Sequence, residues 1–378
     1  MLAVFLVGAG LLLLLRSYLY SRIWSKALSV RVFFAQPHIC AGETGVLTEE
    51  SENRKKQSVP VVEIGFRIPM GLVFTDAENI QESDYLYKRD LFAMEGMERI
   101  IRRYQVKALK RGYYAPDQLS IQAPSFLFRY QYAMETPSRE QAEGMYVYAR
   151  QVDCTPLLRV LEAVLGERES AKRLYEDPFV FSSIRQYTAQ DPMKTINWKA
   201  TARTGDLMVN TYASVTSVRI RIFLDVSADG NSAFSEDLME LSVSAAASLA
   251  RNLVSRDESV SFLVNAYEEE GRFAAFRIGR GLETLTQMEE YLTLDFAEKA
   301  VVPFADMVGQ TADREKDRDA DEVCVFFSAA DTPALRANIH RLLGERGSGI
   351  LVLSVRSAEN RTKERDGNLM VLPFADTE

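Results

Sequence analysis

The chain has 378 residues, a length typical of about two or three domains. It carries 45 Lys and Arg residues against 53 Asp and Glu residues, a formal net charge of -8. A dedicated nucleic-acid-binding protein normally carries a basic surface, so this balance argues against that class. With 47% hydrophobic and 26% charged residues, the composition is that of a folded globular chain.

Histidine and cysteine are too scattered for most enzyme and metal motifs. The two histidines, His38 and His340, lie in no recognisable motif, so histidine-based zinc sites and Ser-His-Asp hydrolysis are not expected. The cysteines, Cys40, Cys154 and Cys324, form no Cys-x-x-Cys pair, which argues against a disulfide framework or a structural zinc. Free thiols fit a reducing compartment.

The N-terminus predicts a membrane anchor. Residues 1–15 carry no charge, but a helix of that length reaches only about 22 Å, less than the hydrocarbon core of about 30 Å. Continuing to Trp24 supplies the missing length, with Arg16 snorkelling and Trp24 at the membrane surface. A signal peptide is the alternative, but its basic start and small-residue cleavage site are lacking. Basic residues follow the apolar run, so we expect a single-pass cell-membrane protein, anchored by residues 1–24, with the bulk of the chain cytoplasmic.

Residues 28–132 predict an antiparallel β-sandwich domain. Short alternating or β-branched runs, separated by Gly, Pro, Asn and Asp, are typical of strands. These runs are Leu28–Phe34, Pro60–Arg67, Tyr104–Leu109 and Leu119–Gln122. Residues 133–217 are predicted to connect this domain to the next, with a helix over Thr155–Leu165 that has apolar residues at helical spacing.

From residue 218 to 356, strands and helices alternate. The predicted strands are Val218–Leu224, Ser259–Val264, Glu322–Phe327 and Ile350–Val355, and the predicted helices are Ser235–Val254, Leu282–Leu292 and Pro333–Leu343. This alternation predicts parallel crossovers and a doubly wound α/β sheet. Residues 357–378 are predicted to be a C-terminal tail.

The loop after the first strand of this sheet holds the main candidate site. In such sheets ligands bind beyond the carboxyl ends of the strands, where Asp225, Ser227 and Asp229 are expected. Their oxygens suit Mg²⁺, Ca²⁺ or Mn²⁺. A turn that caps the following helix would use the same residue types, so both interpretations stay open.

The segment Asp177–Tyr212 mixes basic and aromatic side chains. Such a mixture can bind nucleic acid or phosphate. The acidic total and the interleaved Asp191 and Asp206 favour a connector between domains, held by hydrogen bonds and cation–π contacts. In this interpretation Trp198 is an aromatic anchor at the domain junction. Arg185 and Arg203 would pair with Asp191, Asp206 or backbone carbonyls.

This segment resembles the signature of a bacterial family, the domain-of-unknown-function family number 58. The matching residues are Arg185, Tyr187, Asp191, Lys194, Ile196, Trp198, Ala202 and Arg203. Two positions depart from the pattern, because Gln190 stands where Gly is usual and Lys194 where Arg is usual. The resemblance extends from the N-terminus to about residue 356.

The resemblance implies a membrane-anchored protein with a β-rich domain and, over residues 218–356, a von Willebrand factor A-like domain. It implies an association with a MoxR-type AAA+ ATPase and with other membrane proteins. It also implies a divalent-cation site, the metal-ion-dependent adhesion site, whose D-x-S-x-S element is matched by Asp225 and Ser227. Asp229 replaces the second Ser and Asp331 comes late, so a degenerate site without a metal is an equal alternative to one holding Mg²⁺ or another divalent cation.

We therefore expect a membrane-anchored scaffold or adaptor that presents its A-like domain to protein partners. With the ATPase, it would act in the assembly or maturation of other complexes, without being an enzyme and without binding nucleic acid. Two alternatives stay open. A divalent-metal-dependent hydrolase would use Asp225, Asp229 and Asp331, but no positioned His or reactive Cys base accompanies them. An extracellular adhesion protein is opposed by the basic residues after the apolar run.

Overall fold

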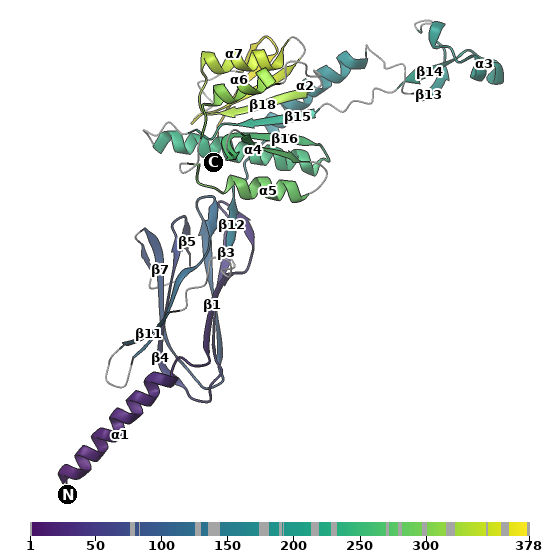
Figure 1. The fold of residues 1–378 in the computed structure, drawn as a ribbon. Coiled ribbons are helices and arrows are strands. Elements are labelled where there is room, and N and C mark those ends of the chain that lie inside the picture. Colours follow the sequence, from purple (N-terminus) through teal and green to yellow (C-terminus); the bar gives the residue numbers. More distant parts are fainter. Residues whose placement is uncertain are drawn as a thin grey trace. The chain divides into compact units, whose positions relative to one another are not determined.

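The computed structural model describes two compact units (Figure 1). The first, called the β unit, comprises Met1–Gln151 with Gln287–Asp295, and the second, called the α/β unit, comprises Val152–Thr286 with Phe296–Glu378. The structure describes residues 2–375 apart from the following positions: 76–79, 83, 125–129, 135–143, 174–180, 189–190, 192, 213–218, 228–232, 270–271, 279–281, 297–300, 315–321, 345–346 and 357–362. Each unit is described by itself.

The first unit begins with helix α1 (Leu2–Ile23). Among the described residues, no helix is both long enough and apolar enough to cross a membrane. The predicted anchor over residues 1–24 is therefore wrong, and with it the single-pass membrane location. The uncharged run ends at Arg16. Trp24, expected at a membrane surface, is instead 4% exposed in the core of the β unit, and Tyr20 packs against that core.

Two antiparallel sheets form the body of this unit. The first has the order β1-β3-β8-β5 and the second β11-β10-β4-β7-β6. Their strands are β1 (Leu28–Phe34), β3 (Thr44–Asn53), β8 (Arg99–Ala108), β5 (Leu72–Phe74), β11 (Tyr130–Met134), β10 (Asp117–Pro124), β4 (Val59–Pro69), β7 (Tyr85–Met94) and β6 (Ile80–Glu82). A small third sheet joins β2 (His38–Cys40), β12 (Met145–Tyr148) and β9 (Gly112–Tyr114).

One hydrophobic core lies between the two large sheets. Leu47 and Val106 come from the first sheet and Ile64 and Leu86 from the second, and none of the four is more than 1% exposed. Along β8, buried residues alternate with exposed ones, because successive side chains of a strand point to opposite faces. This alternation gives each large sheet an apolar face that the other covers.

A polar cluster is buried among these apolar residues. The Tyr104 hydroxyl lies within hydrogen-bonding distance of Glu49 Oε2, at 3.2 Å, and of Asp90 Oδ2. The Lys88 ammonium pairs with Asp90 Oδ1 at 2.7 Å, and the Arg102 guanidinium lies 3.6 Å from Glu49 Oε1. Burial, with a further contribution from the Asp90 charge, raises the pKa of Glu49 to about 7. The cluster links strands of both large sheets through groups that titrate.

The second unit contains a sheet with the order β17-β16-β15-β18-β19-β21-β20. Its strands are β17 (Arg272–Ile278), β16 (Val260–Glu269), β15 (Arg219–Leu224), β18 (Glu322–Ser328), β19 (Ser348–Ser354), β21 (Leu369–Phe374) and β20 (Glu364–Asp366). The inner pairs are parallel, whereas β17 and β20 pair antiparallel with their neighbours. The segment predicted as a tail, residues 357–378, thus supplies β20 and β21.

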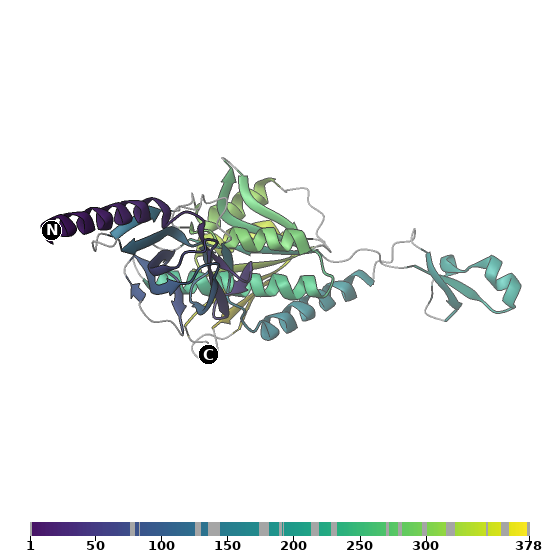
Figure 2. The ribbon, with the colours of Figure 1, turned by 90° about the horizontal axis from the view of Figure 1, so that it is seen from below.

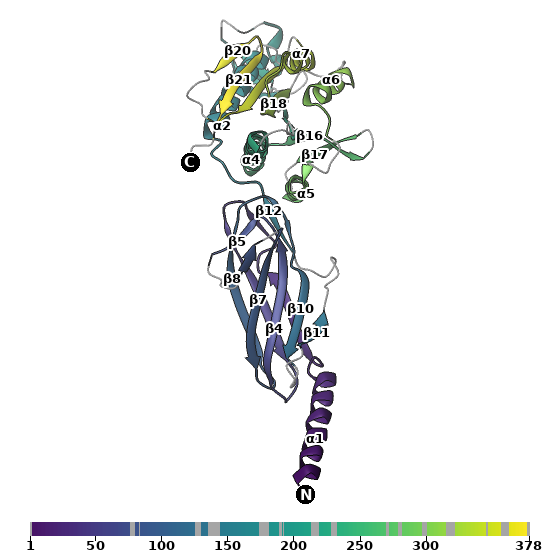
Figure 3. The ribbon, with the colours of Figure 1, turned by 90° about the vertical axis from the view of Figure 1, so that its left-hand side faces the viewer.

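Helices lie on both faces of this sheet (Figure 3). They are α2 (Thr155–Arg173), α4 (Ala233–Ser255), α6 (Phe304–Arg314) and α7 (Pro333–Leu343), whereas α5 (Leu282–Leu292) belongs to the first unit from Gln287 onward. Helices α6 and α7 cover one face, where Met307 and Ile339 pack with Phe223, Phe326 and Leu351 of the sheet. Helix α4 covers the other face, against β15, β16, β18 and β19.

The predicted fold class is corrected by these observations. The structure is mixed α/β with several sheets, without a membrane-spanning helix among its described residues and without a clear doubly wound von Willebrand factor A fold. A doubly wound parallel sheet needs a crossover between successive strands. Here β16 leads directly into β17, and β20 into β21, so each pair is an antiparallel hairpin at a sheet edge.

The Glu49 cluster predicts how the stability of the β unit depends on pH. The folded pKa of Glu49, about 7, lies above its ordinary value of 4.5, so the folded state binds the extra proton between these values. The free energy of unfolding of the β unit therefore falls by on the order of 3 kcal/mol as the pH rises through this window. Glu49→Gln should flatten the dependence. The measurement is urea unfolding at pH 5 and pH 8, followed by the fluorescence of buried Trp24 in a Trp198→Phe background.

Glu63→Gln, at a carboxylate on β4, is the matched control and should leave the pH dependence unchanged. An equal flattening in both variants would contradict the assignment to Glu49.

Candidate functional site: the carboxyl edge of the seven-stranded sheet and the signature unit

Asp225 lies where β15 ends, at the edge predicted to hold the site. Its backbone N–H donates to the carbonyl of Phe327 at 2.9 Å, so the ladder between β15 and β18 extends one residue past β15. The residue is only 6% exposed. The parallel pairing brings the carboxyl ends of β15 and β18 beside the middle of β16 at this point.

The Asp225 carboxylate accepts hydrogen bonds from residues on or next to all three strands. Ser227 donates to Oδ1 through its backbone N–H, at 3.0 Å, and through its hydroxyl. Asn265, on β16, donates to the same oxygen at 2.8 Å. The hydroxyl of Ser328, at the end of β18, donates to Oδ2 at 2.7 Å. These donors saturate much of the carboxylate's accepting capacity.

Asn265 extends this network into the backbone. Its side-chain oxygen accepts from the N–H of Val226 at 2.8 Å, and its Nδ2 also donates to the carbonyl of Val302 at 2.9 Å. One amide thus joins Asp225, the loop after β15 and the segment before α6. Sequence analysis missed both Asn265 and Ser328. Asn265 directly follows the predicted strand Ser259–Val264, and Ser328 directly follows the predicted strand Glu322–Phe327. Asp225 has the same position relative to the predicted strand Val218–Leu224.

Two opposing effects act on the pKa of Asp225. Burial raises it, because the charged form loses water, and the hydrogen bonds from Ser227, Ser328 and Asn265 lower it. Burial is the larger effect, so the pKa lies above its ordinary value. No Lys, Arg or His side chain contacts this carboxylate in the described part of the chain.

The fit of a divalent cation to this edge is partial. The Asp225 carboxylate lies beside the Ser227 and Ser328 hydroxyls, and such oxygens suit Mg²⁺. Asp229 lies outside the described residues. Within the described ranges, no group of three or more His, Cys, Asp or Glu residues has the geometry of a metal site. The predicted site of Asp225, Ser227, Asp229 and Asp331 stays a prediction.

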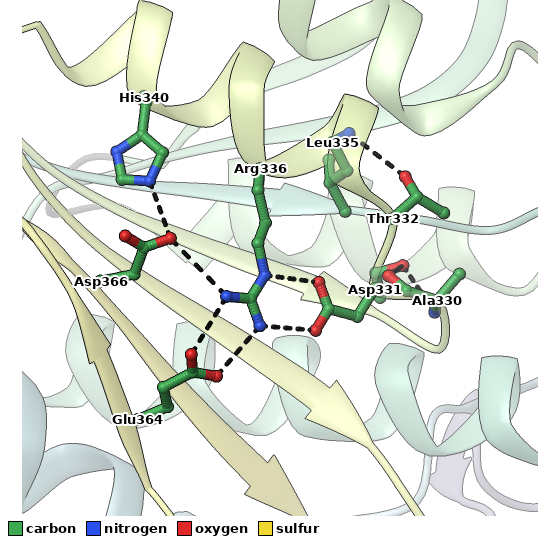
Figure 4. Close-up of polar contacts among 9 residues, drawn as sticks. Ala330, Asp331, Thr332, Leu335, Arg336, His340, Glu364 and Asp366 are labelled. Carbon is green, nitrogen blue, oxygen red and sulfur yellow. Dashed lines mark hydrogen bonds and ion pairs between the residues drawn. The ribbon is translucent and has the colours of Figure 1, made fainter.

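Asp331 is held in a different set of contacts, drawn in Figure 4. Its two carboxylate oxygens accept from Nε and Nη2 of Arg336, each at 2.8 Å. Arg336 also binds Glu364 at 3.1 Å and lies 3.6 Å from Asp366, whose carboxylate contacts His340 Nε2 at 3.2 Å. The carboxylates of Asp331 and Glu364 raise the pKa of Arg336, which therefore keeps its charge. These ion pairs of Arg336 join the loop after β18 to α7 and to β20.

The signature residues build a small unit of their own. Strands β13 (Phe181–Gln186) and β14 (Met208–Tyr212) form a two-stranded antiparallel sheet. The 3₁₀ turn η1 (Met193–Thr195) and helix α3 (Trp198–Thr204) connect them, and α3 lies beside β14 (Figures 1 and 2). We call β13, η1, α3 and β14 the signature unit.

An ion pair closes the loop of this unit. Arg185 binds Asp191 through two hydrogen bonds, at 2.6 and 2.7 Å. Thr188 donates to the same carboxylate through its backbone N–H and its hydroxyl, each at 2.8 Å. These contacts, the Arg185 bonds first, hold the pKa of Asp191 well below its usual range. The predicted pairing of Arg185 with Asp191 is therefore present in the structure.

Helix α3 is stabilised by a cap at each end and by a small apolar core. Asn197 caps its start, because the side-chain oxygen accepts from Ala200 N at 3.0 Å while Nδ2 donates to Asn210 at 2.7 Å. Gly205 ends it with φ of 80°, a left-handed conformation that glycine adopts without strain. Ile196 and Val209 are buried and form a β-bridge. The signature thus encodes the local fold of this unit.

Trp198 does not have the buried setting expected of an anchor between domains, since it is 66% exposed. Lys194, Lys199 and Arg203 are also exposed, and their side chains make no hydrogen bond or ion pair within the described residues. Arg203 thus pairs with neither Asp191 nor Asp206. Tyr187 is half-buried, and its backbone N–H donates to the carbonyl of Leu207.

Asn265→Ala should destabilise the α/β unit. The substitution removes the donor to Asp225 and the acceptor for Val226, and a buried polar group left without a partner costs about 1–3 kcal/mol. We expect a loss of about 3 kcal/mol in the free energy of unfolding, measured by urea denaturation. Asn252→Ala is the control, because Asn252 makes a single side-chain bond, to Ser248 within α4, and should lose less than about 1 kcal/mol. Equal losses would contradict the central role of Asn265.

The solved structures similar to this chain are distant from it in sequence. No curated protein matches it. The chain is similar to the CARDB domain of the PF1109 protein from Pyrococcus furiosus, in complex with di-metal ions, with 10% identity and a TM-score of 0.20 over 32% of this chain and 86% of that one. It is also similar to a non-cellulosomal cohesin from Archaeoglobus fulgidus (13% identity, TM-score 0.21, 27% and 82% covered). A third is Spo0M, a sporulation control protein from Bacillus subtilis (10% identity, TM-score 0.20, 43% and 58% covered).

The family match is more specific. Residues 183–361 match the model of the family described as protein of unknown function DUF58. This range includes the signature unit and, in the α/β unit, the strands that meet at Asp225. The resemblance drawn from Arg185, Trp198 and Arg203 is therefore confirmed over residues 183–361, which match the DUF58 family model.

Proposed function

We propose that the protein is a non-catalytic scaffold or adaptor that binds a protein partner at the carboxyl edge of its seven-stranded sheet. By the family resemblance, the partner is a MoxR-type AAA+ ATPase that acts in the assembly or maturation of other complexes. The support is one observation: both described carboxylates expected to do chemistry at this edge are already engaged. Asp225 accepts four hydrogen bonds and Asp331 is clamped by Arg336.

This engagement favours a binding role over catalysis. A general base must be within reach of a substrate proton and free to accept it. Asp225 is buried, and its oxygens face Ser227, Asn265 and Ser328. A network of this kind joins three strands and so holds the adjoining loops in one conformation. A preorganised surface loses less entropy when a partner binds.

A second candidate function is a divalent-metal-dependent hydrolase. It is favoured by the two hydroxyls, of Ser227 and Ser328, beside the Asp225 carboxylate. In that case the cation would replace the hydroxyl protons as the partner of the carboxylate. It would polarise a phosphoester for attack by water.

A pull-down of the tagged full chain from its source cells, analysed by mass spectrometry, tests the proposal. We expect recovery of an AAA+ ATPase with the natural sequence and at least about tenfold less with Asp225→Ala, because that change releases the donors of three strands. Asp237→Ala, at an exposed carboxylate of α4, is the matched control and should recover the ATPase normally. Repeating the natural sequence with a chelator shows whether a cation contributes.

Two outcomes would overturn the proposal. One is equal recovery of the ATPase by a folded Asp225→Ala protein. The other is no recovery of the ATPase by the natural sequence, together with divalent-cation-dependent phosphoester hydrolysis that Asp225→Ala abolishes, which would establish the hydrolase instead.

A further inference from the structure

The signature unit exposes both apolar and basic side chains. Met193 is 71% exposed and Trp198 66%, although both are large apolar side chains. Lys194 lies next to Met193 in η1, and Lys199 and Arg203 lie on α3 with Trp198. We call Met193, Lys194, Trp198, Lys199 and Arg203 the basic tryptophan face.

The charge of this unit is opposite to that of the chain. Residues 183–212 contain four basic and two acidic side chains, a net charge of +2, whereas the whole chain carries -8. The ion pair of Arg185 with Asp191 is internal. The excess positive charge therefore lies on Lys194, Lys199 and Arg203, which make no side-chain contact with an acidic group in the described part of the chain.

The arrangement of these cations is unfavourable for the unit by itself. Lys199 and Arg203 are four residues apart on α3, and like charges at this spacing destabilise a helix. The helix is only 7 residues long and depends on its caps. An anionic partner would reduce this repulsion.

We propose that the basic tryptophan face binds an acidic segment of a partner protein, with an apolar side chain of that segment packed on Trp198. Trp and Arg are the residues most often found at the energetic centre of protein interfaces. Carboxylates would pair with Lys194, Lys199 and Arg203. A long nucleic acid fits less well, because its phosphates would approach a chain that is strongly acidic outside this unit. This surface goes beyond the proposed function, since it does not include the carboxyl edge of the sheet.

Binding is measured with the full chain and a short fluorescein-labelled peptide that repeats Glu-Glu-Leu-Gly. We expect saturable binding by fluorescence anisotropy, weakened at least about tenfold by the double substitution Lys199→Glu and Arg203→Glu. Higher salt should weaken it as well, since the cations are exposed. The matched control is the double substitution Arg89→Glu and Lys107→Glu, which changes the net charge equally at exposed positions of the β unit and should bind normally.

The two tryptophans locate the contact. Trp198 is exposed and Trp24 is 4% exposed, so the peptide should protect Trp198 from iodide quenching and shift its emission to shorter wavelength. Trp198→Phe should abolish both effects while leaving the thermal unfolding of the protein unchanged. Asp225→Ala should leave peptide binding unchanged, so a failure of the edge-binding proposal and a failure of this one are distinguishable.

Three results would overturn this inference. One is equal weakening by the control double substitution, which would mean non-specific charge attraction. Another is protection that persists in Trp198→Phe, which would place the contact at Trp24. The third is tighter binding of a labelled single-stranded RNA that the Lys199→Glu and Arg203→Glu protein loses, which would assign the face to nucleic acid.

Discussion

The α/β unit depends on one buried carboxylate. Asp225 directly follows β15 and accepts hydrogen bonds from Ser227 after β15, from Asn265 within β16 and from Ser328 at the end of β18. A buried charge without partners would be very costly, so the sheet edge is stable only with these donors in place. The same contacts hold Asp225 away from solvent and fix the loop that begins at Val226. The hydrogen bonds to Asp225 therefore stabilise the fold of this sheet edge. A partner that binds here would contact loops that these hydrogen bonds already hold in place.

The signature unit is stabilised in a different way from the sheet edge at Asp225. Its stability comes from contacts close in sequence: the Arg185–Asp191 pair, the Asn197 cap and the Gly205 turn. With little more than Ile196 and Val209 as a core, it buries little apolar surface of its own. Short-range polar contacts replace a large core, and Trp198 is left exposed. A family signature that specifies local geometry can therefore also specify a binding surface.

The β unit shows the cost of placing charges between apolar sheets. Glu49, Lys88, Asp90 and Arg102 balance one another in charge, and Tyr104 bridges the two carboxylates. Even so, desolvation keeps the pKa of Glu49 near neutrality. No sequence pattern pointed to this cluster, because β3 is distant in the chain from β7 and β8 and only the packing of the sheets brings their charges together.

The sequence by itself determined the local elements and the family. Periodicity located β1, α5 and α7 to the residue, and the spacing around Trp198 identified the DUF58 region. The tertiary structure decided which of those residues meet: Asn265 and Ser328 with Asp225, and Arg336 with Asp331. It also decided the role of Trp24, which packs in a protein core, and added β17, β20 and β21 to the sheet. The physical reason is that helix and strand periodicity is a local property, whereas burial and pairing partners depend on residues distant in the chain.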